Sequence, residues 1–231
     1  VQVLNPTYDG DEDPEFQKRF FLEASTAAKL SHANTVTIFD YGRDGDIYYI
    51  AMELIRGRTL YRVLREDGPL TEDRVAHILR QVGRSLREAH ALGVIHRDMK
   101  PANVVLLRSE TDEADSVKVL DFGLVKHVDK NEAEDLTQQG LFMGSPKYMA
   151  PEQILGKKVD ETADVYSVGV IMYEMATGVP PYSRGDHMSV MYQHVQGKAQ
   201  SLQELNPNLP PGLADVVTKS MAVDKLKRYV S

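Results

Sequence analysis

Residues 96–103 read His-Arg-Asp-Met-Lys-Pro-Ala-Asn, a dense group of polar side chains between two apolar segments. The segment before this stretch, from Thr71 to about Gly93, repeats apolar residues at helical spacing and predicts a long helix. The segment after it, 104–107, is continuously apolar and predicts a short strand. We therefore expect the polar stretch to form a loop between a helix and a strand.

Two further clusters follow in the sequence. Residues 121–123 read Asp-Phe-Gly and close a second predicted strand, 117–120. Residues 144–152 read Gly-Ser-Pro-Lys-Tyr-Met-Ala-Pro-Glu. A match to any single cluster is weak evidence, but the full set, in this order and in suitable local structure, is specific.

In these clusters the chain resembles the eukaryotic-like serine/threonine protein kinases, especially their bacterial branch. The resemblance extends over essentially all 231 residues and begins at what corresponds to the third strand of the small lobe. It implies an α+β fold with two lobes: an incomplete β-rich lobe with one helix at 1–55, and a larger, mainly helical lobe at 56–231. The implied activity is transfer of the γ-phosphoryl group of ATP to serine or threonine hydroxyls of protein substrates, with magnesium (Mg²⁺) as cofactor.

The resemblance gives the polar loop its catalytic roles. Asp98 corresponds to the carboxylate that orients the substrate hydroxyl and accepts its proton, and Lys100 to the cation that contacts the γ-phosphate. By family pattern, a lysine here indicates serine or threonine acceptors rather than tyrosine. Asn103 and Asp121 correspond to the ligands of Mg²⁺, which prefers oxygen donors. Without the resemblance, the alternative is a helix–turn–strand connection with incidental Asp and Asn side chains.

The resemblance also places an adenine site where the two lobes join. The segment from Glu53 to Ile55 corresponds to the hinge, whose backbone C=O and N–H groups bind the edge of the base. Met52 is then the gatekeeper side chain before the hinge, and Val105 packs beneath the ring. Without the family match, these are ordinary strand and connector residues.

Several residues have implied structural roles. His96 and Phe122 correspond to members of an apolar column that ties the lobes together, with Ala27 on the first helix. A catalytic His96 is the alternative, and the resemblance argues against it.

The resemblance also implies contacts that hold the larger lobe together. Glu152 is expected to pair with Arg228 in a buried ion pair, and breaking such a pair typically costs about 3–5 kcal/mol. Asp164 corresponds to a helix carboxylate that accepts hydrogen bonds from the catalytic-loop backbone. Ser145 stands where the family usually has threonine and is expected to bond the same loop.

Regulation is implied by Arg97, because the arginine before the catalytic aspartate usually meets an anion on the activation segment. Thr137 is the only hydroxyl-bearing residue between Gly123 and Gly144. We hypothesise that Thr137 is phosphorylated, through self-association in trans, and that its phosphate pairs with Arg97. The alternative is an unmodified threonine in an acidic loop.

The first 55 residues predict strands around one helix. Asp13 is a good N-cap, Pro14 suits the first helical position, and the helix is expected to reach about Leu30. Glu23 falls on its apolar stripe, where a carboxylate needs a cation or donor unless it reaches water. Two strands are expected at 35–41 and 47–55, with a turn at 42–45. The members of the apolar stripe are Phe16, Phe20, Ala27 and Leu30.

The chain departs from the family pattern near its start. The glycine-rich loop that should cover the phosphates is missing, and Gln2 stands where the family has a lysine that bridges the phosphates and Glu23. Two accounts remain: a working kinase whose sequence here is truncated and altered, or a pseudokinase with a native glutamine. The intact Asp98, Lys100, Asn103 and Asp121 favour the first account. In either case, we expect the chain as printed to be a poor catalyst.

The composition limits the other function classes. With 27 Lys and Arg against 34 Asp and Glu, the net charge of −7 argues against a nucleic-acid-binding protein. The chain has no Cys, which excludes disulfides and thiolate zinc sites. No apolar run approaches the roughly 20 residues of a membrane span, and we expect a cytoplasmic location, alone or as part of a longer or anchored protein.

Two other functions remain as alternatives. A small-molecule phosphotransferase can share the Asp, Asn and Asp core, but residues 144–152 and Lys100 argue against it. A binding-only scaffold is the second alternative.

Overall fold

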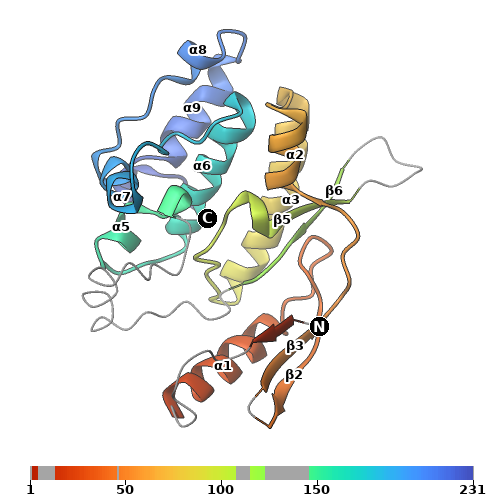
Figure 1. The fold of residues 1–231 in the computed structure, drawn as a ribbon. Coiled ribbons are helices and arrows are strands. Elements are labelled where there is room, and N and C mark those ends of the chain that lie inside the picture. Colours follow the sequence, from red (N-terminus) through yellow and green to blue (C-terminus); the bar gives the residue numbers. More distant parts are fainter. Residues whose placement is uncertain (1, 5–13, 46, 108–114, 123–145, 231) are drawn as a thin grey trace.

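The computed structural model describes residues 2–4, 14–45, 47–107, 115–122 and 146–230 (Figure 1). A small lobe of strands and one helix lies beside a larger, mainly helical lobe, as Figure 1 shows. The lobe boundary between residues 55 and 56 remains a prediction, but it falls between the two three-stranded sheets of the described chain.

The small lobe is an antiparallel sheet covered by one helix. Its strands β1 (Gln2–Leu4), β2 (Ile38–Asp44) and β3 (Ile47–Met52) pair in the order β1-β3-β2. Helix α1 (Pro14–Ala27) contacts β2. The helix ends three residues before the predicted Leu30. Strand β2 continues to Asp44, so of the predicted turn at 42–45 only Gly45 lies beyond the strand, with a positive φ of 57°.

Apolar side chains between helix α1 and the sheet form the core of the small lobe. Phe20 and Tyr48 are buried, and their rings meet edge to face at 5.0 Å. Ala24 and Ile50 complete the buried set. Glu23 is half-buried on the same helix.

The larger lobe holds a second sheet and most of the helices. Strands β4 (Arg58–Thr59), β5 (Val104–Leu107) and β6 (Ser116–Val119) pair antiparallel in the order β4-β5-β6. The helices are α2 (Leu60–Asp67), α3 (Glu72–Ala91), α5 (Pro151–Ile154), α6 (Thr162–Thr177), α7 (His187–Gln196), α8 (Leu202–Leu205) and α9 (Pro211–Ser220). Short 3₁₀ turns are η1 (Pro101–Asn103), η2 (Pro146–Tyr148) and η3 (Lys225–Lys227).

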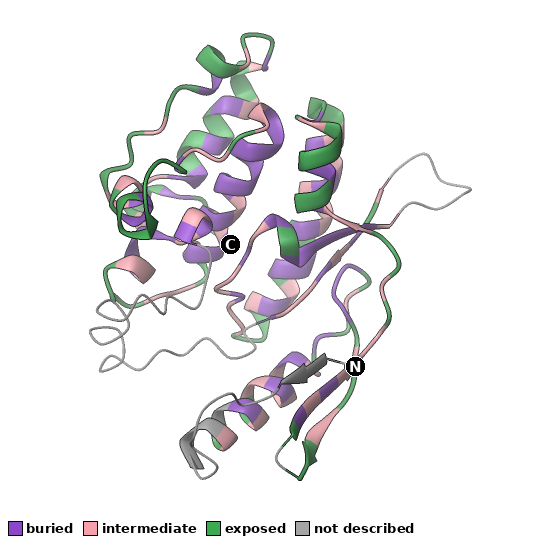
Figure 2. Cartoon of the chain, viewed as in Figure 1, coloured by how far each residue is buried: buried purple, intermediate pink, exposed green. Residues whose placement is uncertain are grey.

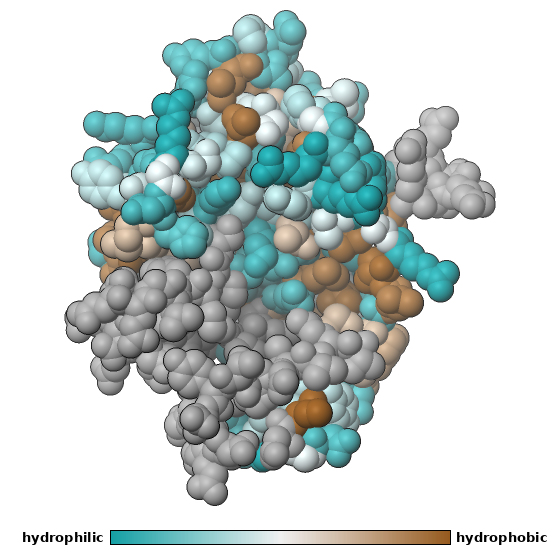
Figure 3. All heavy atoms as spheres, in the orientation of Figure 1, coloured by the Kyte–Doolittle hydropathy of each residue, from teal (hydrophilic) through white to brown (hydrophobic). Residues whose placement is uncertain are grey.

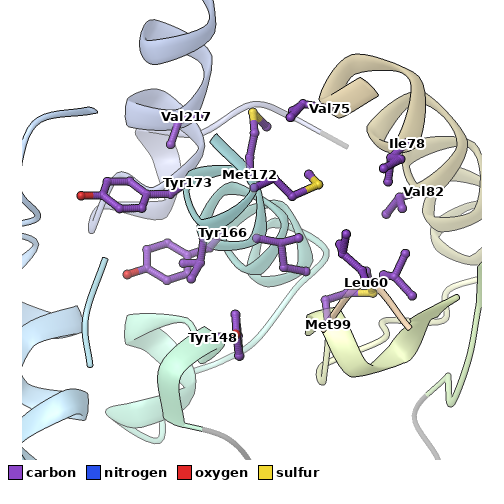
Figure 4. Packing of buried hydrophobic residues seen from close by; sticks show 14 of the residues in the cluster. Leu60, Val75, Ile78, Val82, Met99, Tyr148, Tyr166, Met172, Tyr173 and Val217 are labelled. Carbon is purple, nitrogen blue, oxygen red and sulfur yellow. The ribbon is translucent and has the colours of Figure 1, made fainter. Parts of the chain in front are cut away.

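Helices α3 and α6 meet in the core of this lobe. Thr71 precedes α3, Glu72 and Asp73 lie in its first turn, and His90 lies in its last, which suits the helix dipole at both ends. The apolar residues at helical spacing in α3 are buried, except for Leu79, which is half-buried. The buried members are Val75, Ile78, Val82 and Leu86. Helix α6 is buried over most of its surface, and its Tyr166, Met172 and Tyr173 face the core in Figure 4. Figure 2 shows the same contrast between buried and exposed faces.

The segment after α1 joins the lobes. The backbone N–H of Val36 donates to the carbonyl of Val119 at 2.9 Å, and the N–H of Val119 donates to Asn34 at 2.8 Å. Leu30 belongs to the core of the larger lobe. The predicted strand 35–41 therefore begins three residues late, because the backbone of 34–36 pairs with β6 instead of extending β2.

The surface seen in Figure 3 is mainly hydrophilic over the larger lobe, with hydrophobic atoms gathered on the side where β3 joins β4. Within the part of the chain that the structure describes, no helix has both the length and the apolar character needed to cross a bilayer.

Candidate functional site

The polar loop 96–103 is held to helix α6 by one buried carboxylate. Asp164, which is 1% exposed, accepts hydrogen bonds from the backbone N–H of His96 at 2.8 Å and of Arg97 at 2.9 Å. Its Oδ2 also lies 2.8 Å from His90 Nε2 at the end of α3. Arg97 has a φ of 62°, a left-handed conformation that is unfavourable for a residue with a Cβ atom. The two bonds to Asp164 hold the loop in this conformation.

Three predicted site residues meet within the loop. Lys100 Nζ donates to Asp98 Oδ2 at 2.7 Å, and Asn103 Nδ2 donates to the Asp98 carbonyl at 2.9 Å and to its Oδ2 at 3.3 Å. The side chains of Asp98 and Lys100 are 18% and 25% exposed, whereas Asn103 is buried. The carboxylate is therefore fixed in direction yet reachable from solvent.

A backbone hydrogen bond holds the segment of Asp121 next to the polar loop. The N–H of Leu120 donates to the carbonyl of Asn103 at 2.9 Å, so residue 121 follows directly on a residue bonded to Asn103. Asp121 is half-buried and has a positive φ of 55°. Like Arg97, it holds a strained backbone conformation of the kind that clusters at functional sites.

These residues fit an oxygen-liganded cation. The amide of Asn103 uses its nitrogen for Asp98, which leaves Oδ1 as the donor that a hard cation prefers. Asp121 adds a carboxylate on the residue that follows Leu120, whose backbone is bonded to Asn103. Asn103 and Asp121 are thus the residues that could hold Mg²⁺.

His96 and Phe122 lie together where the lobes meet. Their ring centroids are 4.7 Å apart, both are buried, and a hydrogen bond of 2.7 Å joins His96 Nε2 to the carbonyl of Leu120. Ala27 belongs to the same hydrophobic core as Phe122. A small cavity lies alongside and is lined by Ala27, Leu30, Thr35, Val36, Ile38, Met52, Asp121 and Phe122. Met52 and Asp121 therefore share a cavity, as a gatekeeper and a metal ligand would.

The predicted hinge is tied to strand β6 by an ion pair. Glu53 Oε1 accepts hydrogen bonds from Lys118 Nζ at 2.6 Å and from the N–H of Thr37 at 2.7 Å. Burial raises the pKa of Glu53, but the bonds from Lys118 and Thr37 outweigh it, and the pKa lies below its ordinary value. The backbone N–H of Glu53 donates to the carbonyl of Thr37 at 2.9 Å. The side chain and N–H of Glu53 are thus engaged with the protein.

Val105 is buried on β5 close to the end of the hinge. A Cβ atom added to Gly57 would lie 2.8 Å from Val105 Cγ1 and 2.4 Å from the carbonyl oxygen of Leu106. Only glycine allows the hinge backbone to pass this close to β5. Ile55 is half-buried between Met52 and this crossing.

Glu152 and Arg228 form a closed ion pair. Two hydrogen bonds of 2.6 and 2.8 Å join the Arg228 guanidinium to the Glu152 carboxylate. The side chain of Arg228 is 0% exposed and that of Glu152 is 6% exposed. Arg228 also donates to the carbonyls of Thr162, Ala222 and Val223. The structure thus brings together two residues that lie 76 positions apart.

Within the third cluster, Tyr148 is hydrogen-bonded to helix α6. The hydroxyl of Tyr148 donates to Glu174 Oε2 at 2.6 Å, and Ser167 Oγ donates to the Tyr148 carbonyl at 2.7 Å. Burial, and then the nearby Glu174 carboxylate, raise the pKa of Tyr148. Burial likewise raises the pKa of Glu174.

Sequence reasoning missed two residues of this site. Gln153 Nε2 donates to the carbonyl of Arg97 at 3.0 Å, so α5 supports the catalytic loop directly. His90 contacts Asp164 from the last turn of α3. Only sequence position could have indicated these two residues. Gln153 directly follows the Pro-Glu of the third cluster, and His90 lies shortly before the polar loop.

Three predicted residues cannot be placed in this site. Thr137 and Ser145 lie outside the described residues, and so does the side chain of Gln2, whose backbone pairs with Ile50.

Comparison with known proteins identifies the family. The sequence profile described as the protein kinase domain matches residues 7–230. The chain belongs to the protein kinase family. A probable serine/threonine-protein kinase of Clostridium acetobutylicum is 38% identical over 229 residues, covering 99% of this chain. Serine/threonine-protein kinase PknA of Mycobacterium tuberculosis is 36% identical over 236 residues and covers the whole chain.

A solved kinase structure agrees with the fold. A mutant of the Mycobacterium tuberculosis PknI kinase domain matches with a TM-score of 0.74 and 27% identity, covering 100% of this chain and 79% of that one. The predicted bilobal kinase fold is therefore confirmed. The kinase domain seen here spans 33% of the Clostridium relative and 52% of PknA.

Proposed function

We propose that this chain is the catalytic domain of a serine/threonine protein kinase that transfers the γ-phosphoryl group of ATP to Ser or Thr hydroxyls of protein substrates. The observation that carries the proposal is the polar loop itself, in which Asp98 is bonded by Lys100 at 2.7 Å and by Asn103, beside Asp121. The names of the relatives point the same way.

Each loop residue has a defined task in this reaction. Asp98 Oδ2 orients the substrate hydroxyl towards the γ-phosphorus and takes its proton as the new O–P bond forms. The bond from that phosphorus to the β–γ bridging oxygen breaks, and ADP leaves. Lys100, already paired with Asp98, offers its ammonium to the γ-phosphate oxygens. When bound, Mg-ATP supplies the phosphoryl group and a metal ion that neutralises charge on the phosphate oxygens. Asn103 and Asp121 are the proposed metal ligands.

The nucleotide base is proposed to bind at the hinge. The proposed contacts are the carbonyl of Glu53 and the N–H of Ile55, which would bind the edge of the base, with Met52 at the end of β3 and Val105 on β5 bordering it. Glu53 is held by Lys118 and Thr37 through its side chain, which leaves its carbonyl for the base.

A label-transfer assay tests the proposal. The chain is incubated with γ-labelled ATP, Mg²⁺ and a generic basic protein, beside an Asp98→Asn variant of nearly the same shape. We expect transfer to fall by about 10²–10⁴-fold in Asp98→Asn, the usual effect of removing a general base. Nucleotide binding, measured by calorimetry, should change by only a few fold.

The same assay distinguishes the binding-only alternative. If the chain with Gln2→Lys binds Mg-ATP but transfers no more label than the same chain with Asp98→Asn, the scaffold function is favoured. A Gln2→Lys variant is included, because Gln2 stands at the family's lysine position. For a kinase, restoring this cation should increase kcat/KM, whereas a scaffold should remain inactive.

Regulation is proposed to act through Arg97 and Thr137. Phosphorylation of Thr137 by a second copy of the chain would supply an anion for the Arg97 guanidinium. Phosphopeptide mapping of active protein checks this: an unmodified Thr137 together with full activity of Thr137→Ala contradicts it. We further propose a cytoplasmic location, where ATP and protein substrates are available.

A further inference from the structure

Helix α3 carries three exposed arginines on one side. Arg80, Arg84 and Arg87 are spaced by four and three residues, so they lie on neighbouring turns of the same face. This face is opposite the buried stripe that contains Val82 and Leu86. We call the three residues the arginine ridge.

The arginines of the ridge are not used within the described part of the chain. No ion pair or hydrogen bond joins any of them to another described residue, whereas Arg58, Arg62 and Arg74 each pair with a carboxylate. On α2 the residue four positions after Arg62 is its partner Glu66, but four positions after Arg80 is another arginine. Like charges at this spacing destabilise a helix slightly. Glu88, four positions after Arg84, accepts a hydrogen bond from the N–H of Ser31 at 3.2 Å instead. Among the described residues, no bond to the ridge offsets this cost.

Gly83 is a second, independent feature of the same surface. It is exposed, lies in the middle of the 20-residue helix, and is one turn from both Arg80 and Arg87. A Cβ atom added to it would meet nothing within 4 Å. Glycine in a helix interior is unfavourable relative to alanine. Elsewhere in the chain close packing explains a glycine, as at Gly57, but nothing inside the described molecule explains Gly83.

We propose that the arginine ridge and Gly83 form a docking surface for an acidic segment of a partner protein. Gly83 lets the partner's backbone approach α3 closely, and the arginines on either side pair with carboxylates spaced one helical turn apart. Arg guanidinium groups match carboxylates in two parallel hydrogen bonds, which favours such pairing.

Charge on and around the ridge favours a protein segment over an extended polyanion. The chain has a net charge of −7, so a nucleic acid or an anionic bilayer would be repelled by most of the molecule. Glu72 and Asp73, exposed in the first turn of α3, limit the basic surface at one end. A short segment with a few carboxylates fits the length of the ridge without meeting these acids. This inference does not depend on phosphoryl transfer.

The test measures binding of a defined probe to the whole chain by fluorescence anisotropy. The probe is a labelled alanine-based helical peptide with glutamates three and four residues apart, and the control peptide has glutamines in their place. We expect the glutamate peptide to bind at least tenfold more tightly at low salt. Substituting Arg80→Gln, Arg84→Gln and Arg87→Gln together should remove this difference, whereas Arg62→Gln with Arg65→Gln on α2 should keep it.

The Gly83→Ala variant tests whether Gly83 contacts a partner or only solvent. We expect it to raise the melting temperature, because alanine favours the helix, and to weaken peptide binding at least fivefold. Raised stability with unchanged binding would overturn the close-approach role of Gly83. Equal binding of both peptides, or binding to phosphatidylserine-containing vesicles in preference to the peptide, would overturn the proposal as a whole.

Discussion

At the residue scale, single buried polar groups set the geometry of the site. Asp164 shows this most clearly, because its two oxygens accept from His96, Arg97 and His90 while the side chain is 1% exposed. The positive φ of Arg97 persists because two of these bonds hold it. Losing an acceptor here leaves a buried N–H group unsatisfied.

We predict that Asp164→Asn lowers kcat by at least tenfold. The amide has one acceptor oxygen instead of two, and its NH₂ group faces a backbone N–H, so Asp98 loses its orientation. The stability cost should be about 1–3 kcal/mol, the typical cost of one unsatisfied buried group. Label transfer and urea unfolding measure the two effects. Asp73→Asn, at an exposed position of α3, is the control, and equal losses in both variants would contradict the prediction.

At the scale of elements, a few contacts between segments distant in sequence fasten the larger lobe. The Glu152–Arg228 pair links α5 to the residue after η3, and Arg228 lies 4.8 Å from the ring of Tyr166 on α6. Helix α6 packs tightly against the end of α9 at Gly169, where an added Cβ atom would lie 2.8 Å from Ser220 Cβ. These contacts position α5, whose Gln153 supports the catalytic loop.

We predict that Arg228→Met destabilises the protein by about 3–5 kcal/mol, because it leaves the Glu152 carboxylate buried without its cation. This is a large part of a typical stability of about 5–15 kcal/mol. Urea unfolding is the measurement. The double variant Glu152→Met with Arg228→Met should be more stable than Arg228→Met alone, and a double variant that is less stable would contradict this account.

We predict that Gly169→Ala costs about 1–3 kcal/mol, because the added methyl group forces α6 and α9 apart. The matched control is Gly212→Ala in α9, where an added Cβ atom meets nothing within 4 Å. That variant should be neutral or slightly stabilising. Gly169→Ala should therefore lower the melting temperature, whereas Gly212→Ala should leave it unchanged or raise it slightly. A neutral Gly169→Ala would refute the close-packing argument.

At the scale of the whole molecule, buried titratable groups couple stability to pH. His194 on α7 is fully buried, its Nδ1 lies 2.8 Å from the hydroxyl of Tyr166, and its ring packs against Tyr182 at 4.6 Å. Burial lowers the pKa of His194 to about 4 from an ordinary value of 6.5. The unfolded chain therefore binds the proton more readily than the folded protein does.

We predict that stability is lost as pH falls from about 6.5 towards 4, by up to roughly 3 kcal/mol from His194 alone. The contribution is fully present above pH 6.5, because His194 is then neutral in both states. Urea unfolding at several pH values measures it. His194→Gln should reduce the slope, and His187→Gln, at an exposed position of the same helix, should not. An unchanged slope in His194→Gln would show that other groups cause it.

Much of the site could be predicted because it is local in sequence. Asp98, Lys100 and Asn103 lie within six residues, and one loop conformation is enough to bring them together. Helix α3 was predicted for the same reason, since caps and apolar spacing are properties of neighbouring residues. Helix α2 was not predicted, because its eight residues are too few to show a clear helical repeat of apolar positions. Its N-cap is nevertheless present, since Thr59 Oγ1 accepts from the N–H of Arg62 at 3.2 Å.

The sequence by itself determined the kinase family, the catalytic loop and the main helix of the larger lobe, because these depend on the order and spacing of residues close together in the chain. Only the tertiary structure decided that Lys118 holds Glu53, that Gln153 supports Arg97, and that the backbone of 34–36 pairs with β6. Such contacts join residues tens of positions apart, and their geometry is set by how the helices and sheets pack against one another.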